Sequence, residues 1–364
     1  MGARAAGAVE REAQVNSMLG MLVFALGGLS GAMFLLPARY VRDWGYETWW
    51  MFYCVVGLLI CPPVICAITV PDFWSVTMSV PGKTLLQCAA FGAIWGIGGL
   101  TWGLMVRYLG IGLGLAIGCG LCAATGTLIP PIVQGHAADL VKDAGAITVL
   151  AGVVGSLVGI AFVGAAGKSK EGELPEEEKK KAVAEFNFRK GMVVAVISGV
   201  CSACMNFGLQ SGGAIETAAY EAAVKAGRIA PGELFPWQGM PVIMVVLWGG
   251  FVVQVAWVIR QHVKYWSFGD YFFNGPVLRN WIFASLVGII WVFQFVCTKA
   301  GEPLMGDLKY ISFAIVMAST ILFSTVIGVF TGEWRGTGGK TRGCLALGIL
   351  ILLVSFCAIS MGSK

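Results

Sequence analysis

Charged residues are scarce in this chain. Asp, Glu, Lys and Arg together make up 12% of its 364 residues, whereas hydrophobic residues make up 57%. Because an ordinary soluble domain carries about 25% charged residues, the chain lacks half of the groups that would keep its surface in water. The composition therefore argues against a soluble protein and favours one whose surface faces lipid.

The residues that most enzymes use are scarce as well. The chain has two histidines, and it contains no H-x-x-x-H pair, no G-x-x-x-x-G-K-[ST] loop and no T-V-G-Y-G filter sequence. These absences argue against a helical metal site, an ATP-driven pump subunit and a potassium-type channel. Acid–base and nucleophilic groups do not cluster either, so we expect no enzyme, no metal, no cofactor and no nucleic-acid partner.

What the chain has instead is a series of long apolar runs. None contains Asp, Glu, Lys, Arg or His, and each is long enough to cross a hydrocarbon core of about 30 Å as a helix. The runs cover residues 17–37, 48–70, 84–106, 111–133, 145–166, 191–212, 239–259, 281–298, 311–331 and 343–361. The sequence therefore predicts an all-α polytopic membrane protein with ten transmembrane helices.

A charged stretch divides these runs into five and five. It covers residues 167–190, which we interpret as a linker between a first five-helix repeat (1–166) and a second (191–364). Because an odd number of helices inverts the second copy, this division predicts the inverted repeats found in many transporters. Residues 213–238 are a second hydrophilic piece, for which we expect a short surface helix.

Lysine and arginine are unevenly distributed between the two sides of the predicted bundle. Sixteen of the 25 lie on the side of the charged linker and nine on the other side. Because cytoplasmic loops carry the excess of these residues, we expect a cytoplasmic linker and two periplasmic termini.

Glycine is abundant, with 51 residues, about twice its ordinary share of ~7%. Small residues let helices in lipid approach each other closely. Glycine-rich faces serve packing within one chain or a homodimer equally well, so both interpretations stay open.

Seven sequence blocks occur in order along nearly the whole chain. They are VPDFW (70–74), FGAIWGIGGLTWGLMVRYLG (91–110), GTLIPPIVQG (126–135), AEFNFRKGMVVAVISGVCSACMNFG (184–208), WVFQF (291–295), YIS (310–312) and GEWR (332–335). In these blocks the chain resembles the L-rhamnose–proton symporter family. The resemblance implies a ten-helix fold of the drug/metabolite transporter type in a bacterial inner membrane. It also implies uptake of a 6-deoxyhexose or related monosaccharide driven by protons.

Two blocks depart from the pattern that the family leads us to expect. An asparagine is expected near Gly99, and an alanine-rich run with an asparagine is expected where GLQSGG (208–213) stands. Changes at lining positions alter which solute a site accepts. The substrate is therefore L-rhamnose, another sugar or a sugar derivative.

A neutral sugar is held by hydrogen bonds to its hydroxyls and by aromatic rings against its C–H faces. The apolar runs contain suitable side chains that share a helix face. The pairs are Asn206 with Gln210, Trp291 with Gln294, and Trp95 with Trp102. Tyr310 and Ser312, from the YIS block that carries the resemblance, complete the predicted substrate-binding set.

Each of these side chains also has an ordinary structural explanation. A tryptophan can pack between helices, and a buried amide can bond to a neighbouring backbone carbonyl. For Asn206 and Gln294 we favour the site, because polar groups inside membranes are usually functional. Tryptophans near the ends of the runs, Trp50 among them, are interpreted as members of the interfacial belt.

Proton coupling requires a group that titrates, and none lies within the ten runs. The candidate is Glu47, at the edge of the second run, where aromatic neighbours could desolvate it. A glutamate at a helix N-terminus is also stabilised by the helix dipole, and we favour that explanation. Glu333 and Asp43 are weaker candidates, and His136 is interpreted as a surface residue. Coupling to protons therefore rests on the resemblance, and facilitated diffusion stays open.

The nearest rival function is an exporter of apolar compounds. Such a protein would have an apolar cavity without convergent amides, whereas sugar uptake requires them. The expected partners are therefore a small sugar, protons and the lipid bilayer.

Overall fold

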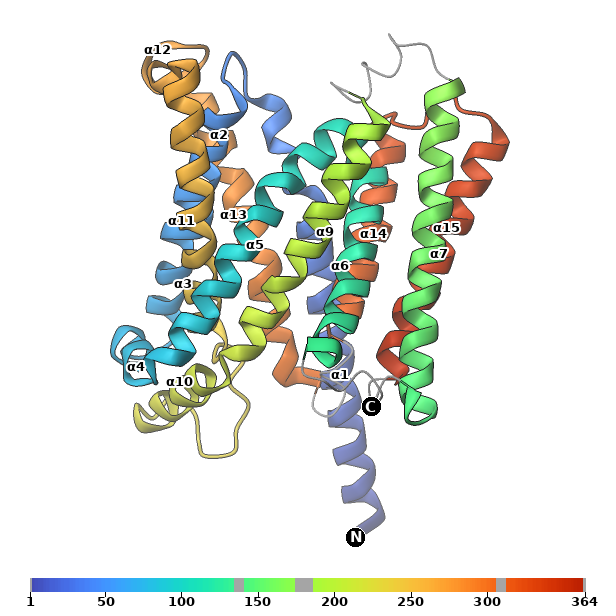
Figure 1. Ribbon diagram of the computed structural model, residues 1–364. Coiled ribbons are helices and arrows are strands. Elements are labelled where there is room, and N and C mark those ends of the chain that lie inside the picture. The colour runs from blue at the N-terminus through green and yellow to red at the C-terminus, as the bar shows by residue number, and fades with distance from the viewer. Residues whose placement is uncertain (1, 134–140, 174–185, 306–311, 363–364) are drawn as a thin grey trace.

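The structure, a computed structural model, describes residues 2–133, 141–173, 186–305 and 312–362. Every regular element in these ranges is helical, and the long helices stand side by side as one bundle (Figure 1). The helices are α1 (Gly2–Met33), α2 (Tyr46–Phe52), α3 (Cys61–Thr69), α4 (Phe73–Ser79), α5 (Gly82–Leu109), α6 (Ile111–Val133), α7 (Ala144–Glu173), α9 (Phe188–Ser211), α10 (Gly213–Lys225), α11 (Met240–Tyr265), α12 (Asp270–Phe273), α13 (Val277–Gly301), α14 (Ser312–Phe330) and α15 (Gly339–Gly362). Shorter helical segments are η1 (Pro37–Tyr40), the π-helix η2 (Tyr53–Ile60) and η4 (Ser267–Gly269).

Eight segments of the described chain are long and apolar enough to cross a membrane. The fourth and ninth predicted runs fall on shorter apolar stretches, Leu113–Gly126 in α6 and Ile315–Phe330 in α14. The chain is thus an all-helical polytopic membrane protein.

The second span contains a wide turn, although the sequence predicts one uninterrupted helix there. Residues Tyr46–Thr69 form a continuous rod of α2, η2 and α3, in which η2 has π-type hydrogen bonding. Pro62 and Pro63 follow directly, and proline supplies no N–H and clashes with a carbonyl one turn earlier. The π turn shifts the bonding pattern at the point where an α-helix could not continue unchanged.

Both ends of the charged stretch, residues 167–190, belong to helices. Helix α7 continues to Glu173, and α9 begins at Phe188. Asn187 caps α9 because its side-chain oxygen accepts a hydrogen bond from the Lys190 backbone N–H at 3.0 Å. The predicted surface helix in 213–238 corresponds to α10.

The two halves of the chain pack against each other along their whole length. In the first half α1 contacts α13 and α14, and α5 contacts α9 and α11. The second span packs on α11 and α13, α6 packs on α9 and α14, and α7 packs on α15. Figure 1 shows α7 and α15 together at one edge of the bundle, and α11 beside α2 and α3 at the other.

Glycine makes the closest helix crossings possible. A Cβ on Gly92 of α5 would overlap the backbone carbonyl of Val246 in α11, and one on Gly249 would overlap the carbonyl of Ala89. Gly57 and Gly288 face each other in the same way between η2 and α13. These glycines are used within one chain, as the packing interpretation expects.

The α5–α11 crossing yields a stability prediction. Gly92→Ala is expected to lower the free energy of unfolding by about 1–3 kcal/mol, because the new methyl group cannot fit against the Val246 carbonyl. Thermal unfolding of detergent-purified protein measures this loss. Gly164→Ala in α7 is the matched control, because no heavy atom lies within 4 Å of its added Cβ. Equal melting temperatures for the two variants would contradict the packing argument.

Candidate functional site

A cavity lies in the middle of the bundle, where the two halves meet. It encloses about 970 Å³ of empty space, its open mouth included, and is lined by residues of α1, α2, η2, α5, α6, α9, α13 and α14. A space between packed helices is a common place for a small-molecule site. The cavity is therefore the candidate binding site.

Aromatic rings form one wall of this cavity. The indoles of Trp95 and Trp291 stack with their centroids 5.1 Å apart, and Phe295 lies 4.6 Å from Trp291. The stack continues through Tyr53, 5.5 Å from Trp291, to Trp50, 4.4 Å from Tyr53. The wall offers broad apolar faces of the kind that pack against the C–H surface of a ring-shaped solute.

Polar side chains of two helices, α9 and α13, also line the cavity. Asn206 and Ser202 come from α9, and Gln294 and Thr298 come from α13. Gln294 has room because Gly31 of α1 lies beside it: a Cβ on Gly31 would meet the Gln294 side-chain oxygen. A lining that combines aromatic rings with amides and hydroxyls is suited to a solute with both C–H faces and hydroxyl groups.

The structure brings five of the predicted substrate-binding residues to this one cavity. They are Trp95, Trp102, Asn206, Trp291 and Gln294. Their assignment to substrate binding stays a prediction. Gly99, where the sequence departs from the expected family pattern, lies in the same lining.

Gln210 does not share the cavity with Asn206. The lining residues of α9 are Ser202, Met205, Asn206 and Leu209, and the side chain of Gln210 is exposed. At about 100° per residue, Gln210 points roughly 90° away from the centre of that lining face. The spacing of four residues between Asn206 and Gln210 therefore does not bring both side chains into the cavity. Tyr310 lies outside the described residues, and Ser312 opens α14 with its side chain outside them.

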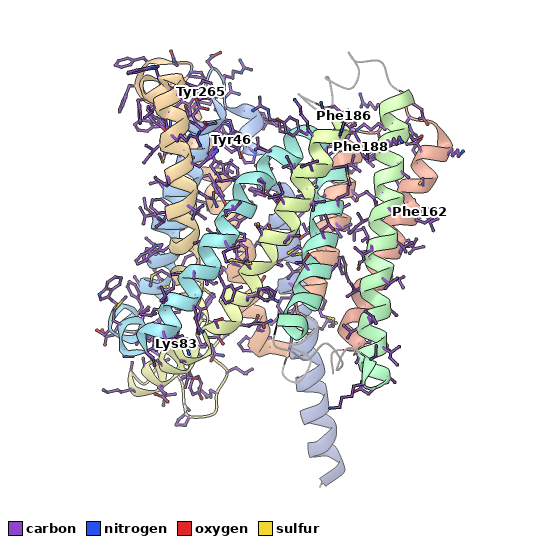
Figure 2. All side chains as sticks on the ribbon, in the orientation of Figure 1. Tyr46, Lys83, Phe162, Phe186, Phe188 and Tyr265 are labelled. Carbon is purple, nitrogen blue, oxygen red and sulfur yellow. The ribbon has the colours of Figure 1, made fainter. Side chains whose placement is uncertain are left out.

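Trp50 was wrongly assigned to the interfacial belt. It is 1% exposed, lines the cavity, and donates from Nε1 to the Gln254 side-chain oxygen at 2.9 Å. Nearness to the end of an apolar run does not reveal which helix face a tryptophan occupies. Tyr46 stacks on Trp50 with ring centroids 5.1 Å apart, and Figure 2 shows Tyr46 at the same end of the bundle as Tyr265.

A buried lysine and two carboxylates stand at the cavity's other end, and the sequence analysis missed them. Glu302 lines the cavity one turn beyond Thr298. Lys299, 7% exposed, lies 2.7 Å from a carboxylate oxygen of Glu216 in α10 and 2.9 Å from one of Glu302. The eighth apolar run was ended at residue 298, so these charges were assigned to a loop. The signal that could have found Glu302 is its place four residues after Thr298, which is itself four residues after Gln294, because residues four apart follow one stripe of a helix.

Glu47 does not line the cavity. Its carboxylate lies against Gly45 at the start of its own helix, which agrees with the dipole explanation, and the side chain is 7% exposed. Glu333 is buried in the turn after α14, and Asp43 is exposed in the segment between η1 and α2. His136 lies outside the described residues.

Comparison with known proteins identifies the family of this chain. The family model described as L-rhamnose-proton symport protein matches residues 14–364. A protein of Cronobacter sakazakii named L-rhamnose-proton symporter is 32% identical over 349 residues, which cover 94% of this chain and 97% of the relative. Proteins of the same name from Shigella sonnei and Escherichia coli O157:H7 are each 30% identical, with the same coverage. No solved structure matches the chain.

The Lys299 ion pairs yield a second stability prediction. Lys299→Met is expected to lower the free energy of unfolding by about 3–5 kcal/mol, because two carboxylates then lose their buried counter-charge. The measurement is thermal unfolding in detergent at neutral and acidic pH. Acid should reduce the loss, since protonated carboxyls need no cation. Lys225→Met, an exposed lysine on α10, is the control, and an equally small effect of both variants would refute the prediction.

Proposed function

Since the chain belongs to the L-rhamnose–proton symporter family, we propose that it carries L-rhamnose or a related monosaccharide across the bacterial inner membrane together with protons. The observation that carries this proposal is the cavity, where stacked indoles from α5 and α13 share the lining with amides from α9 and α13. The indoles of Trp95 and Trp291 cover a C–H face of the sugar. Asn206 and Gln294 bond to its hydroxyls, with Trp102 at the edge of the site. Tyr310 and Ser312 are assigned to this site by the family resemblance.

Alternating access between two inverted five-helix repeats is the proposed transport mechanism. Among the described residues, five long helical rods begin before residue 167 (α1, the second span, α5, α6 and α7) and five begin after residue 187 (α9, α11, α13, α14 and α15), so the proposed repeats are 1–166 and 191–364. The contacts support a two-fold relation. The first rod of one half meets the third of the other (α1 with α13, α9 with α5), and the second, fourth and fifth rods meet their counterparts. The excess of Lys and Arg favours a cytoplasmic linker and periplasmic termini.

Two alternative functions, a facilitator and an exporter, make different demands on the cavity lining. A facilitator of another sugar or sugar derivative would keep the amides and lose the proton dependence, and Gly99 in the lining is where substrate preference would change. A drug/metabolite exporter would not need Asn206 and Gln294 to converge on one space. A homodimer stays a prediction from glycine content alone.

The first prediction of this proposal concerns uptake of radiolabelled L-rhamnose into proteoliposomes. With one proton carried per sugar, an inward proton gradient is expected to concentrate the sugar about tenfold per pH unit, since one unit corresponds to about 1.36 kcal/mol. Liposomes without protein are the control. Uptake that only equilibrates would identify a facilitator, and no uptake by folded protein would move the search to other sugars.

A second prediction concerns the two amides. Asn206→Ala and Gln294→Ala are each expected to reduce the rate of uptake at low sugar concentration about tenfold, because a lost hydrogen bond leaves a sugar hydroxyl unpaired at roughly 1–3 kcal/mol. Gln210→Ala, an exposed amide of α9 outside the cavity, should transport normally. Unchanged uptake in both cavity variants would remove these residues from the site.

A further inference from the structure

Three ionisable side chains are buried together at one end of the bundle, beyond the aromatic wall of the cavity. They are Glu47 of α2, His262 of α11 and Asp270 of α12, which are 7%, 0% and 8% exposed. Figure 1 shows α12 at this end, and Figure 2 places Tyr46 and Tyr265 there. Buried ionisable groups in a membrane protein are costly to keep and often functional. We refer to these three residues as the histidine cluster.

The hydrogen bonds of the His262 imidazole can form whether the ring is neutral or protonated. Nδ1 lies 2.8 Å from the Ser267 hydroxyl, and Nε2 lies 2.6 Å from the Tyr271 hydroxyl. A hydroxyl donates or accepts by rotating its hydrogen, so both nitrogens stay bonded in the neutral and the charged ring. Proton binding therefore requires no movement of heavy atoms around the ring.

Two carboxylates favour the charged form of the cluster. Burial of the imidazole disfavours its charged form, and the negative charges of Glu47 and Asp270 oppose that effect. In the part of the chain that the structure describes, both Lys–carboxylate ion pairs belong to Lys299, at the other end of the cavity. Among these described residues no ion pair joins Glu47 or Asp270 to a Lys or Arg, and a bound proton is the positive charge that can balance them.

The other groups around the cluster do not compete for this proton near neutral pH. Burial raises the pKa of the Tyr271 phenol well above its ordinary value, so it stays a neutral hydroxyl. From η2 the nearby Cys54 acts on Tyr271, and from α5 the charge of Arg107 acts on Tyr46. Lys264 and Arg260, on the same helix as His262, are exposed.

The cluster is connected to the cavity through α2. The Thr48 hydroxyl donates to a carboxylate oxygen of Asp270 at 2.9 Å, and Thr48 stands two residues before Trp50 of the cavity lining. Trp50 in turn bonds to Gln254, which lies two turns before His262 on α11. Among the described residues, the Tyr46 hydroxyl and the Gln254 side-chain nitrogen between these sites are buried without a hydrogen-bond partner. Spare polar groups at this position can take part in moving a proton.

We propose that the histidine cluster is the site that binds the coupled proton, and that α2 links its occupancy to sugar binding at Trp50. This assignment rests on the proposed symport. The proton is shared by three interacting groups, so it belongs to the cluster and not to one residue. By linkage, a bound proton raises the affinity for sugar by the same factor as bound sugar raises the affinity for the proton.

The test is the pH dependence of L-rhamnose accumulation in proteoliposomes containing the whole chain. Glu47→Gln and Asp270→Asn each remove a negative charge, and His262→Gln removes the basic nitrogen. All three therefore weaken proton binding, and the external pH of half-maximal accumulation should fall by about one unit or more. Sugar exchange without a gradient, which needs no net proton movement, should persist and shows that each variant is folded.

Matched controls separate coupling from structural damage. Glu221→Gln, an exposed carboxylate of α10, and His136→Gln, the chain's second histidine, should keep the wild-type pH profile. Glu47→Asp keeps the charge and should keep the profile as well, including in a case where Glu47→Gln does not fold. A wild-type profile in all three cluster variants, or equal shifts in Glu47→Asp and Glu47→Gln, would overturn the assignment. Wild-type protein that accumulates sugar without regard to pH would instead refute the proposed symport.

Discussion

The crossing of α5 over α11 is the contact on which the cavity depends. Gly92 and Gly96 of α5 meet Val246 and Gly250 of α11 at backbone distance, so the two helices are held closer than any side chain would allow. At this crossing Gly250 lies directly against one part of the Trp95 ring. The indole is therefore fixed in place, and its remaining surface stacks on Trp291 and faces the empty space. In lipid, where no hydrophobic force drives helices together, such close packing provides much of the rigidity that a binding site requires.

The low dielectric constant of the interior then determines how polar groups are arranged around the cavity. At one end, Lys299 is neutralised by carboxylates from two helices. At the other end, Glu47 and Asp270 are buried in the same cluster as His262, whose ring nitrogens bond to the Ser267 and Tyr271 hydroxyls. The first arrangement has its balancing cation built in, and the second balances its charge only by binding a proton. The two ends of the cavity thus differ. Charge balance at the Lys299 end is built into the chain, whereas charge balance at the His262 end depends on a proton from the surrounding solution.

Composition and spacing predicted much of the fold, because lipid imposes length and polarity on every span. The predicted runs fall on helices, and the aromatic and amide pairs at Trp95, Asn206 and Gln294 reach one cavity. What could not be predicted depends on contacts between distant segments. Periodicity alone could not show that Gln210 lies just past the edge of the lining. Nor could it reveal that His262, at the end of an apolar helix, contacts Tyr271 of α12, a short helix that the sequence pattern does not predict.

The π turn in the second span has a consequence for the side chains that precede it. A π turn holds one more residue than an α turn, so η2 acts as a one-residue insertion in the helical rod. Without that extra residue, everything on its N-terminal side would be rotated by about 100° relative to α3. Glu47 and Trp50 would then face different neighbours, although neither residue had changed. The direction in which the side chains of α2 point is thus set separately from the direction of those in α3. Insertion or deletion of a single residue between the two parts can turn a different face of α2 toward its neighbours.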